Sequence, residues 1–455
     1  MATACIAQVT FRGEHFPRPV VARCDQPDAS SDGGAILLKA IDEQLGLSAA
    51  LAAGLRDARQ PGKVAHAVHD LLRQRLFGLA CGYADANDAA RLIDDPMHKL
   101  LLDRDPLVGA GLASQPTFSR FENAATRTDL FRLATTLAGR VLDFHHQRLG
   151  DDVRLITLDL DQTDDPTHGQ QELAFFHGYY DTWCYLPLIA TVRFDAEPMQ
   201  YLVAALLRSG RGPVTRGVRG LLRRLVAALR ARFPRARLRV RLDAGFASPK
   251  LLTFLETTGL EYVVALQGNA RLLKRIRRLQ GRARMRARGS GRSERLFGET
   301  RYAARRWPHK RRVIMKAEAL CYPGRLTKNN PRFVVTNLPH RPARVYTIYC
   351  GRGDMENRLK DLQYGLASDR TSCSRFLANQ FRLLLSAAAY VLYQTLQWHA
   401  RSTHLAGAQV TTLREQLIKI AVWVDCSVRR VVLHLPRAFA GLTAWQQIAH
   451  AVGAT

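Results

Sequence analysis

Polar side chains recur at helical spacing in the segment YTIYCGRGDMENRLKDLQYG, residues 346–365. Tyr349, Arg352, Glu356, Lys360 and Gln363 follow one another at steps of three, four, four and three residues. On an α-helix with about 3.6 residues per turn, this spacing places all five on one face. A polar face of this kind does not belong to a core, so it faces either water or a charged ligand.

Further acids lie at the ends of two apolar segments that alternate like strands. In LITLDLDQTDD, residues 155–165, the two-residue period of a strand places Asp159 and Asp161 on the face opposite the apolar residues. Asp243 ends a similar run, RLRVRLD, residues 237–243. An acid near the end of a buried strand costs free energy unless a counter-charge or a metal ion compensates it. Either acid alone has a simpler explanation, because aspartate is common in turns.

Asp161, Asp243 and Glu356 together predict a metal site. Three carboxylates that converge on one point repel each other and keep their charges only around cations. Mg²⁺ prefers oxygen ligands and commonly shares its coordination with substrate phosphates. Two such ions, about 3.5–4 Å apart, can bind the attacking and leaving oxygens of an in-line phosphoryl transfer. The predicted chemistry is therefore metal-dependent attack on a phosphodiester.

The net charge predicts a polyanionic partner. The chain has 455 residues and a formal net charge of +28, from 67 Lys and Arg against 39 Asp and Glu. Nucleic acid is the simplest such partner, and arginine suits bidentate phosphate contacts. The alternatives are a solvated basic surface and an arginine-rich codon bias.

Cysteine usage and hydropathy indicate the compartment. The eight cysteines are scattered singly, with no CxxC pair, which argues against a structural zinc site and against a disulfide framework. The most apolar run, residues 381–401, is interrupted by Arg382 and is typical of a buried helix rather than a membrane span. We expect a cytoplasmic protein with no membrane partner.

The apolar spacing divides the chain into three regions. Residues 1–150 are expected to form a helical DNA-binding domain. In it, a short helix that starts near Pro116 would present Arg120 to a DNA groove, although an ordinary bundle helix explains this segment equally well. From 151 to 370 the predicted order is three strands, helix, strand, helix, strand, which indicates a mixed α/β domain. Residues 371–455 are expected to be helical again.

A strongly basic insertion, about residues 268–342, interrupts the α/β domain. Its second half alternates like strands, so we expect a β-rich insertion, whereas residues 280–293 alone fit a disordered basic loop. Trp307 lies in this insertion, within AARRWPHKRR. It is either a core residue of the insertion or an aromatic surface for a nucleic-acid base.

The chain resembles the DDE transposases of bacterial insertion sequences. In their large hairpin-forming branch, the third acid lies in a helix signature of tyrosine, two residues, arginine, three residues, glutamate, six residues and lysine. Tyr349, Arg352 and Glu356 match this signature, whereas Gln363 stands at the lysine position, one turn beyond Lys360. The similarity spans about 150–370 and points in particular to the insertion-sequence-1380 group, with its ENRLK-type helix.

This resemblance implies an RNase H-like mixed sheet with flanking helices, a β-rich insertion before the last catalytic helix, and helical N- and C-terminal regions. Asp161, Asp243 and Glu356 would ligate two Mg²⁺ or Mn²⁺ ions. Asp161 is preferred as the first acid because the family's first acid tends to stand two residues before Thr or Ser, here Thr163. Asp159 is the alternative.

The resemblance also implies the DNA contacts and the partners. Tyr349, Arg352 and Lys360 would contact phosphates of the DNA end, and Trp307 would stack on a flipped base. The DNA partners would be the terminal inverted repeats and the target, bound by a homodimer near the nucleoid. Two alternatives stay open: a transposase-derived DNA-binding protein without activity, and an RNase H-like nuclease.

Overall fold

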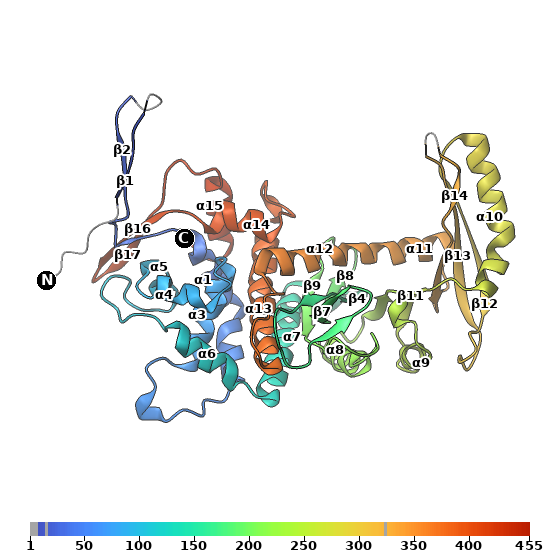
Figure 1. Cartoon of the computed structure of the whole chain (residues 1–455), viewed down its shortest axis with the longest axis horizontal. Helices are drawn as coiled ribbons and strands as arrows, with labels where there is room; N and C mark the ends of the chain where they lie inside the picture. The colour runs from blue at the N-terminus through green and yellow to red at the C-terminus, as the bar shows by residue number, and fades with distance from the viewer. Residues whose placement is uncertain (1–7, 14–16, 323–324) are drawn as a thin grey trace.

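The centre of the protein is a nine-stranded mixed sheet (Figure 1). The computed structural model describes residues 8–13, 17–322 and 325–455. The strands follow the order β12-β13-β15-β11-β10-β4-β8-β9, and the short β14 pairs with β13. The strand bounds are β4 Leu155–Gln162, β8 Leu188–Phe194, β9 Tyr201–Leu206, β10 Arg237–Leu242, β11 Glu261–Leu266, β12 Glu294–Tyr302, β13 Arg311–Leu320, β14 Lys328–Asn329 and β15 Arg332–Thr336.

Five of these strands form an RNase H-like core. Strands β4, β8 and β9 pair antiparallel in chain order, and β10 and β11 then add in parallel on the other side of β4. The connecting helices α8 (Val218–Arg232) and α9 (Pro249–Thr257) lie between β9 and β10 and between β10 and β11 in the chain. The order of strands and helices predicted from the sequence for residues 151–266 is therefore confirmed, as is the fold class.

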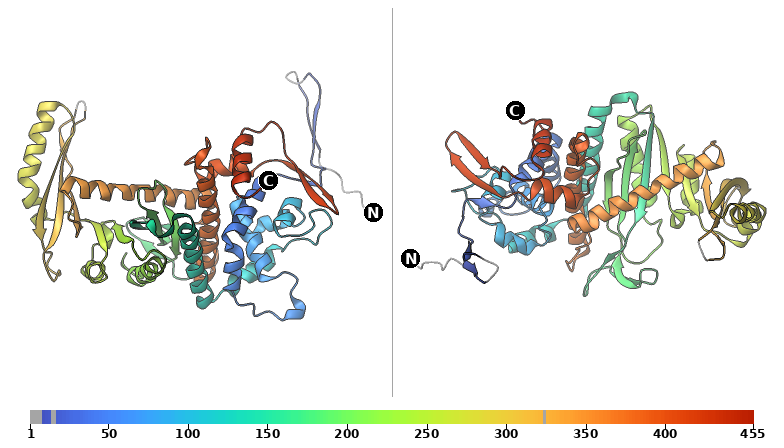
Figure 2. Two further views of the ribbon diagram at one scale, coloured as in Figure 1. Left: turned by 180° about the vertical axis from the view of Figure 1, so that it is seen from behind. Right: turned by 90° about the horizontal axis from the view of Figure 1, so that it is seen from above.

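The polar segment that carries Glu356 crosses this sheet as a segmented helical rod. It consists of α11 (Pro342–Cys350), a 3₁₀ turn (Gly351–Gly353), α12 (Asp354–Lys360) and a π-helical turn (Asp361–Gly365). Seen from above, α11 and α12 run end to end over the sheet (Figure 2, right). Gly351 in the 3₁₀ turn allows the close approach of Arg241, because a Cβ there would collide with its guanidinium.

The basic insertion contains the predicted strands and, in addition, a helix that was not predicted. Residues 270–290, which include most of the expected disordered stretch, form the long helix α10 (Ala270–Ser290). Its apolar stripe was obscured by the surrounding arginines, which themselves favour helix. Strands β12, β13, β14 and β15 make the insertion β-rich as predicted, and they extend the central sheet.

The two ends of the chain pack together into one helical body. Its centre is α13 (Phe376–His399), which packs against α3 (Val68–Ala80), α7 (Arg127–Leu149) and β9. The remaining helices of this body are α1 Ile36–Leu45, α2 Leu47–Ala53, α4 Ala89–Leu92, α5 Pro96–Leu101, α6 Gln115–Ala124, α14 Val410–Leu413 and α15 Leu442–Ala451.

These end regions contain the predicted helices and also short strands. β1 (Gln8–Phe11) and β2 (Val20–Arg23) form a hairpin. β3 (Ala29–Ser30) joins β16 (Val422–Ser427), which pairs with β17 (Arg430–His434). A strand pairing between residues about 390 positions apart cannot be read from local spacing. It makes residues 1–150 and 371–455 parts of one body.

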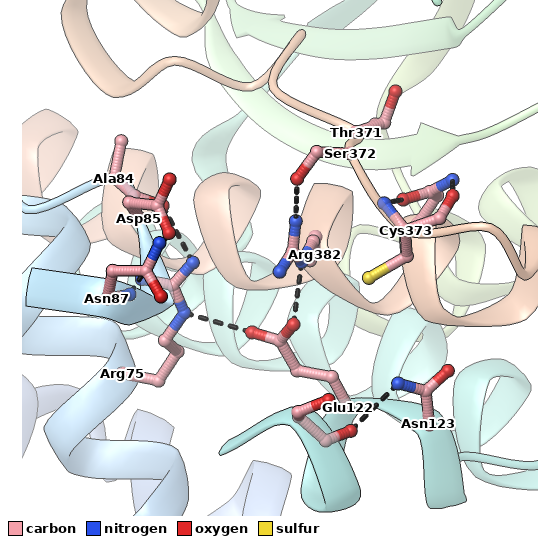
Figure 3. A network of polar contacts seen from close by, with 12 residues as sticks. Arg75, Ala84, Asp85, Asn87, Glu122, Asn123, Thr371, Ser372, Cys373 and Arg382 are labelled. Carbon is pink, nitrogen blue, oxygen red and sulfur yellow. Dashed lines mark hydrogen bonds and ion pairs between the residues drawn. The ribbon is translucent and has the colours of Figure 1, made fainter. Parts of the chain in front are cut away.

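A buried ion-pair network fixes α3 and α6 to α13 (Figure 3). Glu122 is fully buried and accepts hydrogen bonds from Arg75 at 3.0 Å and from Arg382 at 2.6 Å. Arg75 also donates to the carbonyl oxygens of Tyr83 and Ala84. Because removal of one partner from a buried pair leaves an uncompensated charge, this network makes the orientation of α6 specific.

The described residues contain no helix that is long and apolar enough to cross a membrane, and α13 is buried within the helical body. The seven described cysteines are free thiols, and the eighth, Cys5, lies outside the described residues.

Candidate active site

Asp161 and Asp243 stand side by side at the carboxyl ends of two parallel strands. The register of β4 and β10 pairs Asp159 with Arg241, and its continuation by two residues places Asp161 and Asp243 level on the same face, where their charges interact. Asp243 caps the following 3₁₀ turn, and its Oδ1 accepts from the backbone N–H of Gly245 at 2.9 Å. The fold thus brings together two of the three predicted acids.

Both carboxylate oxygens of Asp159, the alternative first acid, accept hydrogen bonds from protein side chains. Asp159 has no exposed surface. Arg241 donates to both of its oxygens, Nε to Oδ1 at 2.7 Å and Nη2 to Oδ2 at 2.5 Å, and Gln200 donates to Oδ2 at 2.8 Å. This carboxylate therefore has the environment of a structural counter-ion.

Arg352 forms an ion pair with Asp161. Its Nη1 lies 2.6 Å from Oδ2 of Asp161. Burial and the neighbouring Asp243 raise the pKa of Asp161, and Arg352 opposes both effects. Tyr349 lies beside this pair, and burial raises the pKa of its hydroxyl against the opposing effect of Arg352. A carboxylate in this position needs a cation, and here the guanidinium supplies it.

Glu356 follows Arg352 by one helical turn on α12. Its side chain is exposed and makes no hydrogen bond or ion pair with the described residues. Met355, the buried residue next to Glu356, attaches α12 to the sheet, because its sulfur accepts a hydrogen bond from the hydroxyl of Thr191 on β8. The third acid therefore lies on the helix that covers the first two.

The last two residues of the polar stripe differ in their surroundings. Lys360 is exposed and has no acidic partner among the described residues. Gln363 instead donates to Oγ1 of Thr163 and to the carbonyl oxygen of Asp164, both at 3.0 Å. The residue that departs from the expected lysine thus connects the helical rod to the loop that follows Asp161.

Comparison with known protein families matches residues 13–453 to the family described as "Transposase DDE domain group 1". The chain belongs to this family. A search of curated proteins finds no match.

Among solved structures, the chain is similar to one titled "Mos1 transposase paired-end complex with left transposon end", at 12% sequence identity and a TM-score of 0.17. The matched region covers 39% of this chain and 57% of that chain, so it spans less than two thirds of that structure's length.

The donor chemistry of the Asp161–Asp243 site suits a divalent metal ion. The carboxylates of Asp161 and Asp243 are near enough to interact electrostatically, and the guanidinium of Arg352 already lies against Asp161. With Glu356 they do not make a tight single-ion cluster: in the described part of the chain, the only three such ligand atoms within 4.8 Å of one another belong to Asp32, Cys81 and His98.

That buried cluster lies in the helical body, away from the acids of the sheet. Its charge is already balanced, because Lys419 lies 2.7 Å from Asp32, and His98 lies 3.0 Å from the same carboxylate. Burial raises the pKa of the Cys81 thiol well above its usual value, so the thiolate that a metal needs is disfavoured.

Trp307 and Arg120, the two remaining predicted residues, lie apart from the acids. The Trp307 side chain is 8% exposed, with its ring against Tyr302 and under the guanidinium of Arg311. This packing favours the core alternative over base stacking. Arg120 is exposed on α6, which begins after Ser114 as expected, and it lines a cavity of about 760 Å³ together with Arg56 and Arg132.

Sequence reasoning missed Arg241 and Gln200, which hold Asp159. The arginine was visible as a charged residue inside an apolar strand, in RLRVRLD. Such a residue predicts a buried counter-ion on a neighbouring strand, and that signal could have separated Asp159 from Asp161.

Proposed function

We propose that this chain is a DNA transposase that cuts and rejoins the ends of an insertion sequence by two-metal phosphoryl transfer. The observation that carries the proposal is the level placement of Asp161 and Asp243 on neighbouring parallel strands, beneath the helix that bears Glu356, in a chain that belongs to a DDE transposase family over almost its whole length. Its placement in the insertion-sequence-1380 group rests on the ENRLK-type helix, residues 356–360.

The three carboxylates would hold two Mg²⁺ or Mn²⁺ ions, with Asp161 rather than Asp159 as the first acid, because Asp159 is occupied by Arg241. When bound, the ions would lower the pKa of a water and stabilise charge on the phosphate. The chain's own residues would position the DNA. Tyr349, Arg352 and Lys360 would bind the phosphates next to the cut.

The reaction would proceed in two phosphoryl transfers. In the first, water gives up a proton, its oxygen bonds to phosphorus, and the bond from phosphorus to the 3′ oxygen breaks, which frees a 3′-OH. In the second, this hydroxyl loses its proton and attacks a phosphodiester of the target, whose own 3′ oxygen leaves. Neither step needs an oxidant or a covalent link to the protein.

The partners follow from the same proposal. The DNA would be double-stranded, with terminal inverted repeats and a target segment, and two copies of the chain would hold two ends. The place of action would be the bacterial cytoplasm, at the nucleoid.

The test is a cleavage assay on DNA that carries the flanks of the gene, with Mg²⁺ or Mn²⁺ supplied. Glu356→Gln should abolish cutting and keep DNA binding, whereas Glu415→Gln, which changes an exposed acid far along the chain, should leave both intact. Cutting that survives Glu356→Gln would remove the role of Glu356. Binding without any cutting by the unaltered chain would identify a DNA-binding protein, and cutting without end preference would identify a nuclease.

A further inference from the structure

Helix α10 carries the densest positive charge of the described structure. All nine of its Lys and Arg side chains are exposed, and it contains no acidic residue. These cations are Arg271, Lys274, Arg275, Arg277, Arg278, Arg282, Arg284, Arg286 and Arg288. At 100° per residue they cover an arc of about 200° around the helix, opposite the buried stripe. Among the described residues none of them forms an ion pair, although Arg275 donates to Thr300.

The other face of α10 fixes it rigidly to the sheet. Leu272, Ile276, Gln280, Ala283 and Ala287 are buried at steps of four, four, three and four residues. Gln280 also donates to the carbonyl oxygen of Glu318 on β13 at 2.8 Å. The charged face is therefore displayed on a firm support, so binding to it would not require ordering the helix.

The composition of this face suits contact with phosphates rather than with bases. Apart from the cations, its exposed positions carry only small or apolar side chains, including Leu273 at 47% and Met285 at 74% exposure. No exposed Asn, Gln, Asp or Glu is present on α10 to read the edges of adenine or cytosine, so the only paired base contact open to its cations is with guanine. Arginine and lysine contacts to phosphate give affinity that is independent of sequence and sensitive to salt.

The position of α10 separates it from the acids. Gly298 of β12 faces α10, since a Cβ there would lie 3.2 Å from Leu279, whereas the adjacent Phe297 faces α11, with its ring 5.5 Å from that of Tyr346. Because side chains alternate along a strand, α10 and α11 lie on opposite faces of the sheet. Arg241, on the face of the acids, donates to the carbonyl oxygen of Ile348 on α11.

The distance along the sheet adds to this separation. Strands β10, β11 and β15 lie between β4, which carries Asp161, and β13. Four strand spacings amount to about 19 Å. Figures 1 and 2 show α10 at the end of the molecule away from the helical body that the two chain ends form.

We infer that α10 binds the backbone of a second DNA duplex, distinct from the segment held at the acids, and does so without sequence preference. This extends the proposed function by assigning a surface to DNA that is held but not cut by this copy of the chain. A target segment, whose sequence is not that of the element's ends, is DNA of this kind.

The first test measures binding of the full chain to a short duplex of arbitrary sequence across about 50–200 mM salt. Lys274→Gln, Arg278→Gln and Arg282→Gln together remove one outer ridge of α10 while glutamine keeps the helix propensity high. Affinity at low salt should fall at least ~10-fold, and the slope of log affinity against log salt should decrease by about two to three. The matched control removes three exposed arginines elsewhere: Arg219→Gln, Arg223→Gln and Arg235→Gln. An equal loss in both variants, or none in the α10 variant, would overturn the inference.

The second test asks for two duplexes at once. An immobilised duplex should capture a labelled duplex through the unaltered chain, and the α10 variant should lose this bridging while it still binds the immobilised duplex. Bridging that persists in the α10 variant contradicts the inference. Neither readout needs catalysis, so a Glu356→Gln chain should bridge normally, and failure of the proposed reaction would leave this result standing.

Discussion

The guanidinium of Arg352 lies 2.6 Å from the carboxylate of Asp161, one helical turn before Glu356. The helix that brings the third acid over the sheet therefore also brings the cation that neutralises the first acid when no metal is bound. In the proposed reaction, divalent ions and Arg352 would compete for the same oxygen of Asp161, so metal binding there would require the guanidinium to move. A DNA phosphate is the partner that arginine would take instead.

Replacement of Arg352 by glutamine should make the protein respond more strongly to metal. Without the guanidinium, Asp161 and Asp243 repel each other in the metal-free chain, so its melting temperature should fall. Mn²⁺ should then raise the melting temperature by more than in the unaltered chain, because the ion no longer displaces a counter-charge. DNA cutting should fall at the same time, because the phosphate contact is lost. The measurement is thermal unfolding with and without Mn²⁺.

The matched control for this experiment is Arg344→Gln, which removes an exposed arginine of α11. It should change neither the melting temperature nor the metal response. A metal response of Arg352→Gln no larger than that of the unaltered chain would contradict the competition.

Asp159→Ala should destabilise the fold by about 3–5 kcal/mol, because it leaves Arg241 buried without its partner. Asp161→Asn should cost less stability, yet abolish the Mn²⁺ response. Urea unfolding of the two variants, with and without Mn²⁺, separates a structural acid from a metal ligand. The reverse pattern, with Asp159 controlling the metal response, would exchange their roles.

The sequence predicted what depends on short-range spacing. Strands of two-residue period and helices of 3.6-residue period gave the order from β4 to β11, and the position of the acids at strand ends followed from it. The pairing of Asp159 with Arg241 spans 82 residues and depends on which strands become neighbours. The pairing of β3 with β16 likewise requires both ends of the chain to meet.

Helix α10 shows a different reason for a wrong prediction. Its buried residues include alanines and a glutamine, so the stripe has little hydrophobic contrast with the arginines around it. Helical structure there depends on the sheet beneath, which local composition does not reveal. The burial of Trp307 depends in the same way on a partner, Arg311, across the β12–β13 turn.

Because of Asp165, the free energy of unfolding should fall as the pH rises. Asp165 is fully buried just beyond β4, where burial raises its pKa from 3.8 to about 8, with Thr371 opposing and Asp369 and Asp164 adding to the effect. The unfolded chain ionises this group near pH 4, whereas the folded chain keeps it protonated to about pH 8. The folded state therefore binds the extra proton between these values, and the stabilisation present below pH 4 is lost through pH 8, on the order of 5 kcal/mol.

Asp165→Asn should flatten this dependence and stabilise the protein above pH 8, because the amide stays neutral. Unfolding by urea at several pH values from about 5 to 9 measures it. Asp151→Asn, at an exposed position, should keep the original profile. An unchanged slope in Asp165→Asn would show that another group causes the dependence.

Variants of Gln363 test how the departure from the family's lysine affects the site. The Gln363 amide connects α12 to Thr163 and Asp164, directly after Asp161. Gln363→Leu should lose both hydrogen bonds, lower the free energy of unfolding in urea by about 1–2 kcal/mol, and slow cutting through misplacement of the loop.

Gln363→Lys should retain donors to the same oxygens and add one phosphate contact, so the salt slope of binding to an element-end duplex should steepen by about 0.9. Gln147→Lys adds the same charge on an exposed part of α7 and should leave that slope unchanged. Equal slopes for the two lysine variants would mean that position 363 does not face the DNA, and its role would then be to hold the loop of Asp161 alone.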